Sequence, residues 1–138
     1  MLELIDVYKT KTAPKILYRL LKEREAPVNI SHRQTPSMKH HLGFIKSKPY
    51  KTWDLIAVNN QVIGATYLSR QNEIGLFIFK KYRNFGYGRQ AVRLLLDKHL
   101  HTDRFLANIN PWNKRSIHFF EQLGFHHIQN TYELRRRE

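Results

Sequence analysis

Two glycines, Gly86 and Gly88, stand between a hydrophobic run and an amphipathic stretch, and they constrain this chain more than any other feature. Glycine permits positive φ angles and leaves no side chain over the backbone amides. Successive N–H groups at the start of a helix then form a concave site for anions, strengthened by the positive end of the helix dipole. The sequence therefore predicts a strand, a tight loop and a helix, with an anion held at the loop.

Basic side chains surround these glycines. Lys80, Lys81, Arg83 and Arg89 all lie close to the pair in the sequence. The whole chain has 24 Lys and Arg against 11 Asp and Glu, a formal net charge of +13, and such a field attracts polyanions and repels cations. The basic residues are spread along the chain rather than gathered in blocks, so the charge fits either solubility with one anionic ligand or a nucleic-acid partner.

Short apolar runs alternate with turn residues throughout, which predicts one α/β domain over residues 1–138. The sheet is expected to be mixed and mostly antiparallel, flanked by helices, in the order β α α β β β α β α β. Asn59 and Asn60 predict a hairpin turn, because Asn tolerates positive φ. The expected strands are 2–8, 53–58, 61–69, 73–79, 104–109 and 125–134, and the expected helices begin near Thr12, Thr35, Tyr87 and Lys114.

Apolar residues indicate which parts of these elements are buried. The run 73–79 is apolar nearly throughout, which is typical of a central strand covered on both faces. Leu42, Phe44 and Ile45 are expected to be the buried residues of the second helix. Gly75 interrupts the run 73–79, and a glycine in a strand marks either a close approach to the backbone or a plain packing requirement.

The glycine loop is part of a longer pattern. Arg83-x-x-Gly86-x-Gly88 after a strand resembles the pyrophosphate loop of the GNAT family of N-acetyltransferases, and residues 113–125 resemble its second signature, Asn-x-x-Ala/Ser-x-x-x-Tyr-x-x-x-Gly-Phe. The two patterns stand in the family's order and spacing, and the expected element order matches that fold. The resemblance implies an acyltransferase that takes acetyl-coenzyme A as cosubstrate, and transfer of the acetyl group to a primary amine by direct attack in a ternary complex.

The resemblance also implies which residues bind the cosubstrate. Asn113 would hydrogen-bond the pantetheine arm, although Asn at a helix start also serves simply as a cap. The strand 73–79 would pair its backbone with the pantetheine, and this close approach would also explain the glycine at position 75. The implied cofactor-binding residues are Ile78, Phe79, Lys80, Arg83, Asn84, Phe85, Gly86, Tyr87, Gly88, Arg89, Asn113 and Ser116.

The amine must lose a proton during transfer, since a lysine-like amine has a pKa of about 10.4. Glu73 is the candidate base, because the family often places a carboxylate at the start of this strand; an exposed strand-end acid is the alternative. The family commonly uses Tyr as the acid at the position of Phe120, and phenylalanine cannot donate a proton. The acid would then be Tyr87 or Tyr132, or no side-chain acid would be needed.

The family builds its acceptor pocket between the first two helices, where His32 and Arg33 are candidates for recognising an anionic acceptor. A solvated loop is the alternative there. The acceptor itself is left open, either an anionic amine or part of a nucleic-acid-associated molecule. The competing function is a basic nucleic-acid-binding domain that uses the same fold without catalysis.

Other partners and sites are not expected. The apolar runs are too short to span a membrane, and the oligomeric state is left open between monomer and homodimer. The chain has no cysteine, and pairs such as His40-His41 and His126-His127 lack the carboxylate or spacing of a zinc site. We therefore expect no metal, and the absence of cysteine suits a cytoplasmic location.

Overall fold

The structure is a computed structural model that describes residues 1–24 and 35–136. Its sheet is antiparallel, and the strands are ordered as in the chain. The strands are β1 (Leu2–Asp6), β2 (Thr52–Val58), β3 (Gln61–Leu68) and β4 (Ile74–Ile78). This arrangement confirms the predicted α/β class with a mostly antiparallel sheet flanked by helices.

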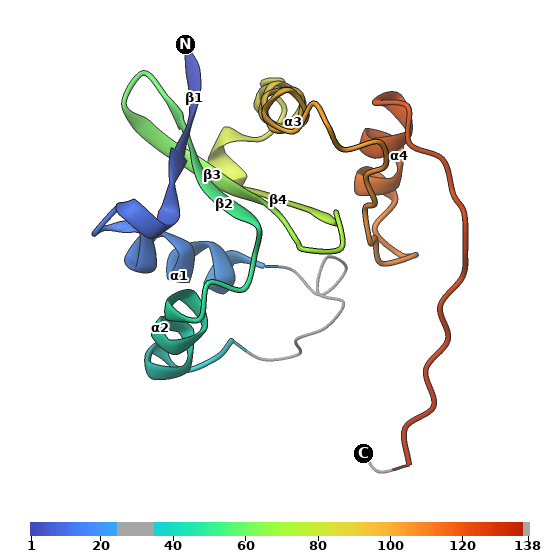
Figure 1. The fold of residues 1–138 in the computed structure, drawn as a ribbon, viewed down its shortest axis with the longest axis horizontal. Helices are drawn as coiled ribbons and strands as arrows, with labels where there is room; N and C mark the ends of the chain where they lie inside the picture. Colours follow the sequence, from blue (N-terminus) through green and yellow to red (C-terminus); the bar gives the residue numbers. More distant parts are fainter. Residues whose placement is uncertain (25–34, 137–138) are drawn as a thin grey trace.

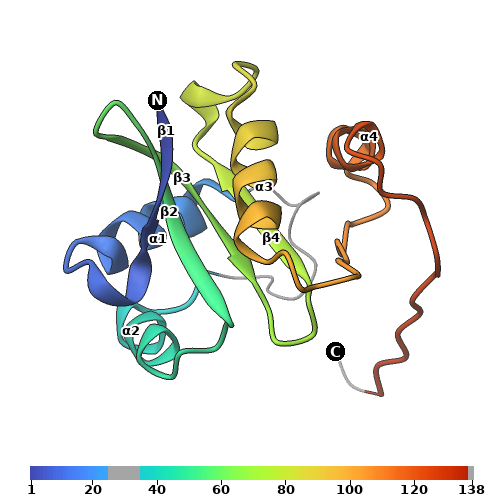
Figure 2. The same cartoon turned by 45° about the horizontal axis from the view of Figure 1, so that its top comes forward.

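Helices cover both faces of the sheet, and a further helix lies beyond the β4 edge (Figures 1 and 2). α1 and α2 pack on one face and α3 on the other. No helix within the described ranges is long and apolar enough to cross a bilayer. The α-helices are α1 (Ala13–Glu23), α2 (Met38–Lys46), α3 (Tyr87–Lys98) and α4 (Lys114–Gln122), and the short 3₁₀ helices are η1 (Val7–Lys9) and η3 (Lys80–Tyr82).

The hairpin between β2 and β3 forms where the sequence predicts it. Asn59 and Asn60 have φ angles of 49° and 69°, and two consecutive positive φ angles match the strand twist of a tight hairpin. The register that the turn sets shifts once, at an irregularity between Ile56 and Ala57. Leu55 is buried on the α1 side of the sheet and Ile56 on the α3 side.

α2 begins later than the sequence indicates. The prediction of a start at Thr35 and Pro36 was wrong, since the first helical residue is Met38. The Ser37 side chain caps the helix by accepting a hydrogen bond from the backbone N–H of His40 at 3.2 Å. Serine with an extended backbone satisfies an end amide in this way, so the start is fixed by the cap rather than by the proline.

The buried face of α2 also differs from the expectation. Ile45 is buried as predicted, but Leu42 and Phe44 are each 44% exposed. His41 takes the inner position instead, because its Nε2 is 2.8 Å from the carbonyl oxygen of Pro14 in α1. A polar group can be buried at low cost when it is hydrogen-bonded, so the histidine joins the two helices.

β4 is an edge strand of the described sheet rather than a central one. A single parallel bridge joins Glu73 to Leu106 on its outer side. The N–H of Ile74 donates to the Leu106 carbonyl at 2.8 Å, and the N–H of Leu106 donates to the Asn72 carbonyl at 2.9 Å. The expected strand 104–109 is thus reduced to one bridge.

Side-chain packing explains why segment 104–109 follows β4 no further. Phe105, Ala107 and Ile109 pack into a cluster with Val92 and Leu95 of α3. These contacts hold the segment toward the helices, and its backbone diverges from β4. An alternating apolar pattern is compatible with a strand but does not guarantee a partner for it.

The expected strand 125–134 is absent as well. After α4 the chain runs extended and away from the sheet (Figure 1). Tyr132 and Leu134 are 90% and 86% exposed. Because segment 104–109 presents no paired edge, this tail has no strand to join, and isolated strand pairs are marginally stable in water.

α4 ends in a glycine cap. Gly124 has a φ angle of 99°. Its N–H donates to the Glu121 carbonyl, and the N–H of Phe125 donates to the Phe120 carbonyl, each at 3.0 Å. The rings of Phe120 and Phe125 pack edge to face, 5.2 Å apart. This is the Schellman arrangement with its hydrophobic contact, so Phe120 belongs to the core.

Candidate active site

The glycine loop joins η3 to α3 and has the backbone geometry expected of an anion site. Gly86, immediately before α3, has a φ angle of 81° and ψ of 6°. A Cβ there would meet no atom within 4 Å, so the positive φ alone favours glycine. Asn84 is also left-handed, with φ of 70°. The amides of the first turn of α3, which begins at Tyr87, have no partner inside the helix and are available to a ligand.

Gly88 serves a different purpose from Gly86. A Cβ at this position would lie 3.3 Å from Cδ2 of Leu76 and 3.4 Å from the ring of Phe119. Its lack of a side chain lets the first turn of α3 pack closely against β4 and α4. The second glycine therefore brings together the elements that carry both signature motifs.

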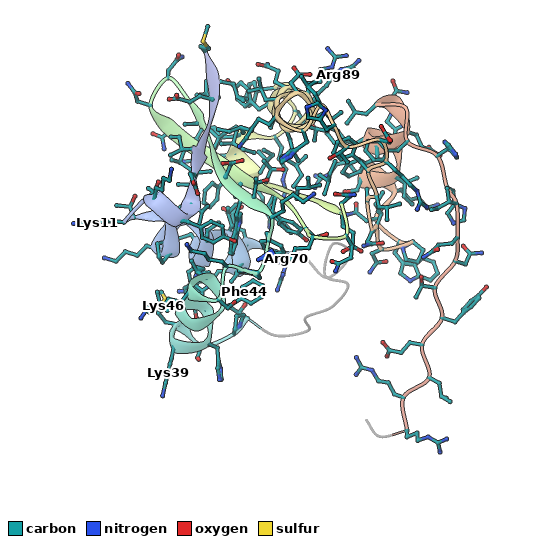
Figure 3. The ribbon with its side chains drawn as sticks, viewed as in Figure 1. Lys11, Lys39, Phe44, Lys46, Arg70 and Arg89 are labelled. Carbon is teal, nitrogen blue, oxygen red and sulfur yellow. The ribbon has the colours of Figure 1, made fainter. Side chains whose placement is uncertain are left out.

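The charged residues near the loop are partly engaged within the protein. Nε of Arg83 donates to the carbonyl of Ile78 at 3.1 Å, which ties the loop to the end of β4. The backbone N–H of Lys80 donates to the Glu23 carboxylate at 2.9 Å. Arg89 is exposed on the first turn of α3 (Figure 3). Of the other residues that resemblance assigns to the cosubstrate, Phe79 is 7% exposed, so its ring belongs to the core.

Asn113 caps α4, as the capping interpretation expects. Its Oδ1 accepts a hydrogen bond from the backbone N–H of Ser116 at 3.2 Å, and the residue is only 7% exposed. Both residues lie at the start of the helix whose Phe119 ring reaches Gly88. A contact from Asn113 to pantetheine stays a prediction.

The outer edge of β4 presents backbone groups that face away from β3. Ile74 directs its N–H outward to Leu106, and the Ile78 carbonyl accepts from Arg83 instead of from β3. In an antiparallel strand every second residue points the same way, so the N–H and C=O of Leu76 also point outward. No segment of residues 1–24 and 35–136 pairs with β4 there beyond the one bridge, which leaves an edge that an extended ligand can pair with.

Glu73 lies at the other end of β4 and is held by two side chains. Nδ2 of Asn108 donates to Oε2 at 2.5 Å, and Oγ of Ser69 donates to Oε1 at 3.1 Å. Ser69 in turn accepts from the backbone N–H of Glu73 at 2.9 Å. The carboxylate is half-buried, which distinguishes it from a freely exposed strand-end acid. Its position is fixed, and lone pairs remain for another donor.

An aromatic pair beside Glu73 was missed by the sequence reasoning. A Cβ on Gly75 would lie only 2.0–2.6 Å from ring atoms of Tyr67, its cross-strand partner, so packing requires the glycine. The Tyr50 ring stacks on Tyr67 with centroids 3.8 Å apart and planes 4° apart. A glycine in an edge strand is commonly covered by an aromatic ring from its neighbour, and that rule is the signal that could have located Tyr67.

The model of the acetyltransferase (GNAT) family matches residues 15–125. This chain belongs to the GNAT acetyltransferase family. Members of the family use acetyl-coenzyme A, and the match spans both the glycine loop and the second signature. No curated protein matches the sequence at a significant level.

Solved structures share the fold across nearly the whole chain. A domain from Methanocaldococcus jannaschii superposes with a TM-score of 0.81 at 21% identity, over 96% of this chain and 93% of the other. An acetyltransferase from Thermus thermophilus gives 0.75 at 17%, over 94% and 90%. The yncA protein of Salmonella typhimurium, solved with its cofactor acetyl-CoA, gives 0.66 at 16%, over 91% and 78%. At these identities the likeness concerns the fold.

The positions considered for a proton donor have different surroundings in this GNAT chain. Phe120 is buried and Tyr132 is on the exposed tail. Tyr87 lies at the loop, stacked on Phe85 with ring centroids 5.8 Å apart. The candidate acceptor residues His32 and Arg33 lie outside the described residues.

Burial sets the protonation of the aromatic pair. Desolvation raises the pKa of both Tyr50 and Tyr67. The interaction with Tyr67 further raises the pKa of Tyr50, whereas the interaction with Tyr50 lowers the pKa of Tyr67. Glu73 further raises the pKa of Tyr67, whereas Arg24 lowers it. Both hydroxyls are therefore neutral at physiological pH.

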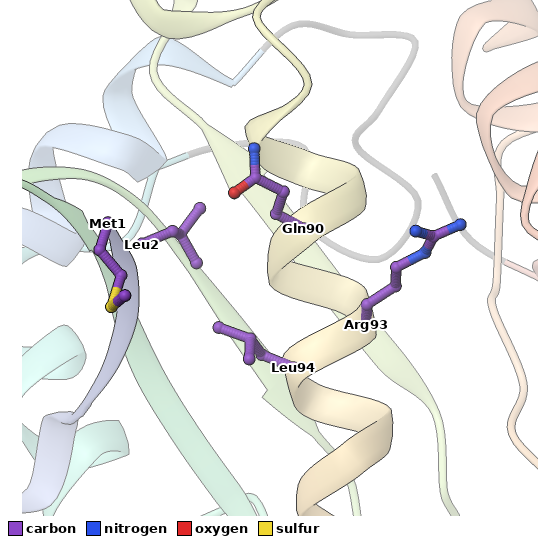
Figure 4. Close-up of a pocket in the computed structure, with 5 residues that line it drawn as sticks. All are labelled: Met1, Leu2, Gln90, Arg93 and Leu94. Carbon is purple, nitrogen blue, oxygen red and sulfur yellow. The ribbon is translucent and has the colours of Figure 1, made fainter.

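Within residues 1–24 and 35–136, the site is the outer edge of β4. Two shallow hollows on the described surface lie elsewhere, one at the β2–β3 turn and one between β1 and the outer side of α3 (Figure 4). Within residues 1–24 and 35–136, no three His, Asp or Glu side chains gather as a metal site would require. The hollows are lined by Met1, Glu3, Asn59 and Asn60 and by Met1, Leu2, Gln90, Arg93 and Leu94.

Proposed function

We propose that this chain transfers the acetyl group of acetyl-coenzyme A to a primary amine by direct attack in a ternary complex. One observation carries the proposal: β4 begins beside the fixed carboxylate of Glu73 and leads through η3 to the glycine loop. Between them runs a strand edge with outward-facing backbone groups. An anion site, an edge for an amide-containing arm and a base are thus arranged along one strand.

Each part of this strand has a chemical task. The amides after Gly86 bind the pyrophosphate, helped by the helix dipole, and the outward N–H and C=O of Leu76 pair with the pantetheine amides. The thioester supplies an activated acetyl group. Glu73, directly or through one water, removes a proton from the bound ammonium group. The neutral nitrogen then bonds to the acetyl carbon, the carbon–sulfur bond breaks to release the thiolate, and the nitrogen gives its second proton to water to leave the neutral amide.

A side-chain acid is not needed for the last step. Phe120 cannot supply a proton, and its ring is part of the core. A thiol has an ordinary pKa of about 8.5, so the thiolate is a stable leaving group that water protonates. The mechanism therefore depends on the base more than on an acid.

Substituting Glu73 tests the proposal. We expect Glu73→Gln to lower kcat by roughly 100-fold at neutral pH, because it removes the base. The loss should shrink at high pH, where more of the amine is already neutral. Release of free thiol and formation of acetylated amine are the measurements, over pH 6.5 to 10.

A matched control distinguishes loss of the base from loss of a negative charge alone. Glu3→Gln removes an exposed carboxylate from β1, at the opposite edge of the sheet, and should leave turnover unchanged. A Glu73→Gln enzyme with normal turnover and an unchanged pH profile would show that another group removes the proton.

The net charge of +13 keeps the nucleic-acid alternative testable. Of the labelled basic side chains, Lys39 and Lys46 lie on α2, Lys11 precedes α1, and Arg89 lies on α3, away from the other three (Figure 3). This spread favours a general positive field over one binding face. A preparation that carries nucleic acid, releases it in high salt and shows no affinity for acetyl-coenzyme A would favour the alternative.

A further inference from the structure

The tail after α4 has the residue pattern of a half-buried strand. Over residues 127–135 polar residues stand at every odd position, and the even positions hold Ile128, Tyr132 and Leu134 with Asn130 between them. In an extended chain such alternation places the apolar side chains on one face. These three side chains are 54%, 90% and 86% exposed within one chain. The tail therefore has an apolar face in contact with water.

The opposite face of the tail is polar. The carboxylate of Glu133 and the guanidinium of Arg135 form an ion pair there. Such a contact is expected where residues two apart share one face of an extended chain. A segment with one apolar and one polar face is stabilised by pairing with a strand that covers the apolar face.

Segment 104–109 has a strand edge that faces away from β4. The N–H and C=O of Leu106 both point toward β4, where they form the two hydrogen bonds of the parallel bridge. The backbone groups of Phe105 and Ala107 point the other way, since their direction alternates along a strand. In both views the segment lies between β4 and the tail (Figures 1 and 2). Its outer edge is therefore turned toward the surface where another strand can be added.

The end of α4 directs the tail away from this edge within its own chain. The N–H of Phe125 donates to the Phe120 carbonyl at 3.0 Å, and the two rings pack 5.2 Å apart. These contacts fix the direction in which the chain leaves the helix, and the tail then runs outward (Figure 1). A second copy can receive this tail and supply its own in return, because a two-fold exchange satisfies both tails at once.

We propose that the chain forms a homodimer in which residues 127–135 of each molecule pair antiparallel with the outer edge of segment 104–109 of the other. The apolar face of the tail then lies on the side where the segment packs against α3. The exchange covers two apolar faces and extends two strand edges in each dimer. This inference concerns assembly and does not depend on the proposed acetyl transfer.

Charge and side-chain type select the register. With Glu133 opposite Arg104, opposite charges face each other, and Tyr132 lies opposite Phe105. Moving the tail by two residues is the smallest step that keeps its apolar face on the same side. A step in one direction places Arg135 opposite Arg104, and a step in the other places the Tyr132 ring opposite a carboxylate. The first register is therefore the favoured one.

Engineered disulfides test this pairing, because the chain has no cysteine of its own. Directly opposite residues in an antiparallel pair are close enough for a disulfide. Under mild oxidation the double variant Arg104→Cys/Glu133→Cys, altered at two exposed positions, should form a covalent dimer on a non-reducing gel. Glu3→Cys/Glu133→Cys is the control, since Glu3 is exposed on β1 at the opposite edge of the sheet. A disulfide within one chain, or cross-linking no faster than in the control, would overturn the proposal.

A leucine substitution gives a second test that needs no cross-link. Leu134→Ser should raise the dissociation constant of the dimer by about 100-fold or more, because two leucines lose apolar contacts in each dimer. Analytical ultracentrifugation measures this constant. Leu42→Ser makes the same chemical change on α2, where the side chain is 44% exposed, and should leave the constant unchanged. A wild-type protein that sediments as a monomer at high micromolar concentration, or equal losses in the two variants, would contradict the exchange.

Discussion

The sites at the two ends of β4 are formed by different groups, backbone amides at one end and side chains at the other. At the C-terminal end the loop uses backbone amides, and Gly86 is set by its φ angle of 81° while facing open space. At the N-terminal end the carboxylate of Glu73 is held by the side chains of Ser69 and Asn108. The first end depends on backbone conformation and the second on side-chain chemistry, so the same kind of substitution should affect them differently.

The largest expected effect is at the backbone end. Gly86→Val should lower affinity for acetyl-coenzyme A by about 100-fold or more, because a non-glycine residue at positive φ costs about 1–2 kcal/mol and a displaced amide loses a charge-assisted hydrogen bond of about 1.5–3 kcal/mol. Isothermal titration calorimetry would measure the affinity. Glu73 and its partners should be undisturbed, since no contact joins them to Gly86.

An asparagine at the same position separates the effect of the φ angle from the effect of side-chain bulk. Gly86→Asn adds a side chain into open space and tolerates the left-handed conformation. We expect it to retain most of the affinity that valine loses. Equal losses in both variants would mean that side-chain bulk, and not the φ angle, decides binding.

A smaller effect is expected at the side-chain end. Asn108→Ala removes the 2.5 Å hydrogen bond to Glu73 and should lower kcat about tenfold, the equivalent of one hydrogen bond to a charged group. The affinity for acetyl-coenzyme A should not change. Steady-state kinetics and calorimetry together distinguish this positioning role from a general loss of structure.

Asn110 provides the matched control for Asn108. Its side chain accepts from the backbone N–H of Trp112 at 2.9 Å and has no contact with Glu73. Asn110→Ala should therefore leave kcat near the wild-type value. A similar loss in both variants would show that segment 104–110 acts as a whole rather than through one amide.

The smallest effect concerns stability at high pH. Because the folded protein raises the pKa of Tyr50, the unfolded chain releases this proton near pH 10 while the folded chain keeps it. The contribution to stability is full below about pH 10 and is lost as the pH rises further. Urea unfolding between pH 9 and 11 should show a shallower decline for Tyr50→Phe. Tyr132→Phe, on the exposed tail, should retain the wild-type slope.

The same contrast explains what the sequence could reveal. A backbone site can be recognised in the sequence because few residues tolerate positive φ, and so the role of Gly86 was predictable from its place between a strand and a helix. Glu73 was reached through family resemblance. Asn108 left no local signal, and Tyr67 was indicated only through Gly75 on the neighbouring strand, because their roles depend on how distant segments align.

The fold predictions also succeeded where a feature is defined locally in the sequence and failed where it needs a distant partner. The β2–β3 hairpin was predicted because Asn59 and Asn60 define it locally. Segments 104–109 and 125–134 have strand-like patterns, yet a strand also needs a paired edge, which no local pattern reports. In α2, His41 occupies the buried position because its ring can hydrogen-bond a distant acceptor, the Pro14 carbonyl.

The ring of Tyr67 above Gly75 has a consequence for how this protein can change over generations. Because the ring occupies the space that any side chain at position 75 would need, neither position can vary alone without loss. A larger residue at 75 becomes acceptable only after a smaller one at 67, and the energetic effects of the two changes will not add. Relatives with different acceptors are therefore expected to exchange the two residues as a pair, so that acceptor range shifts in discrete steps instead of drifting.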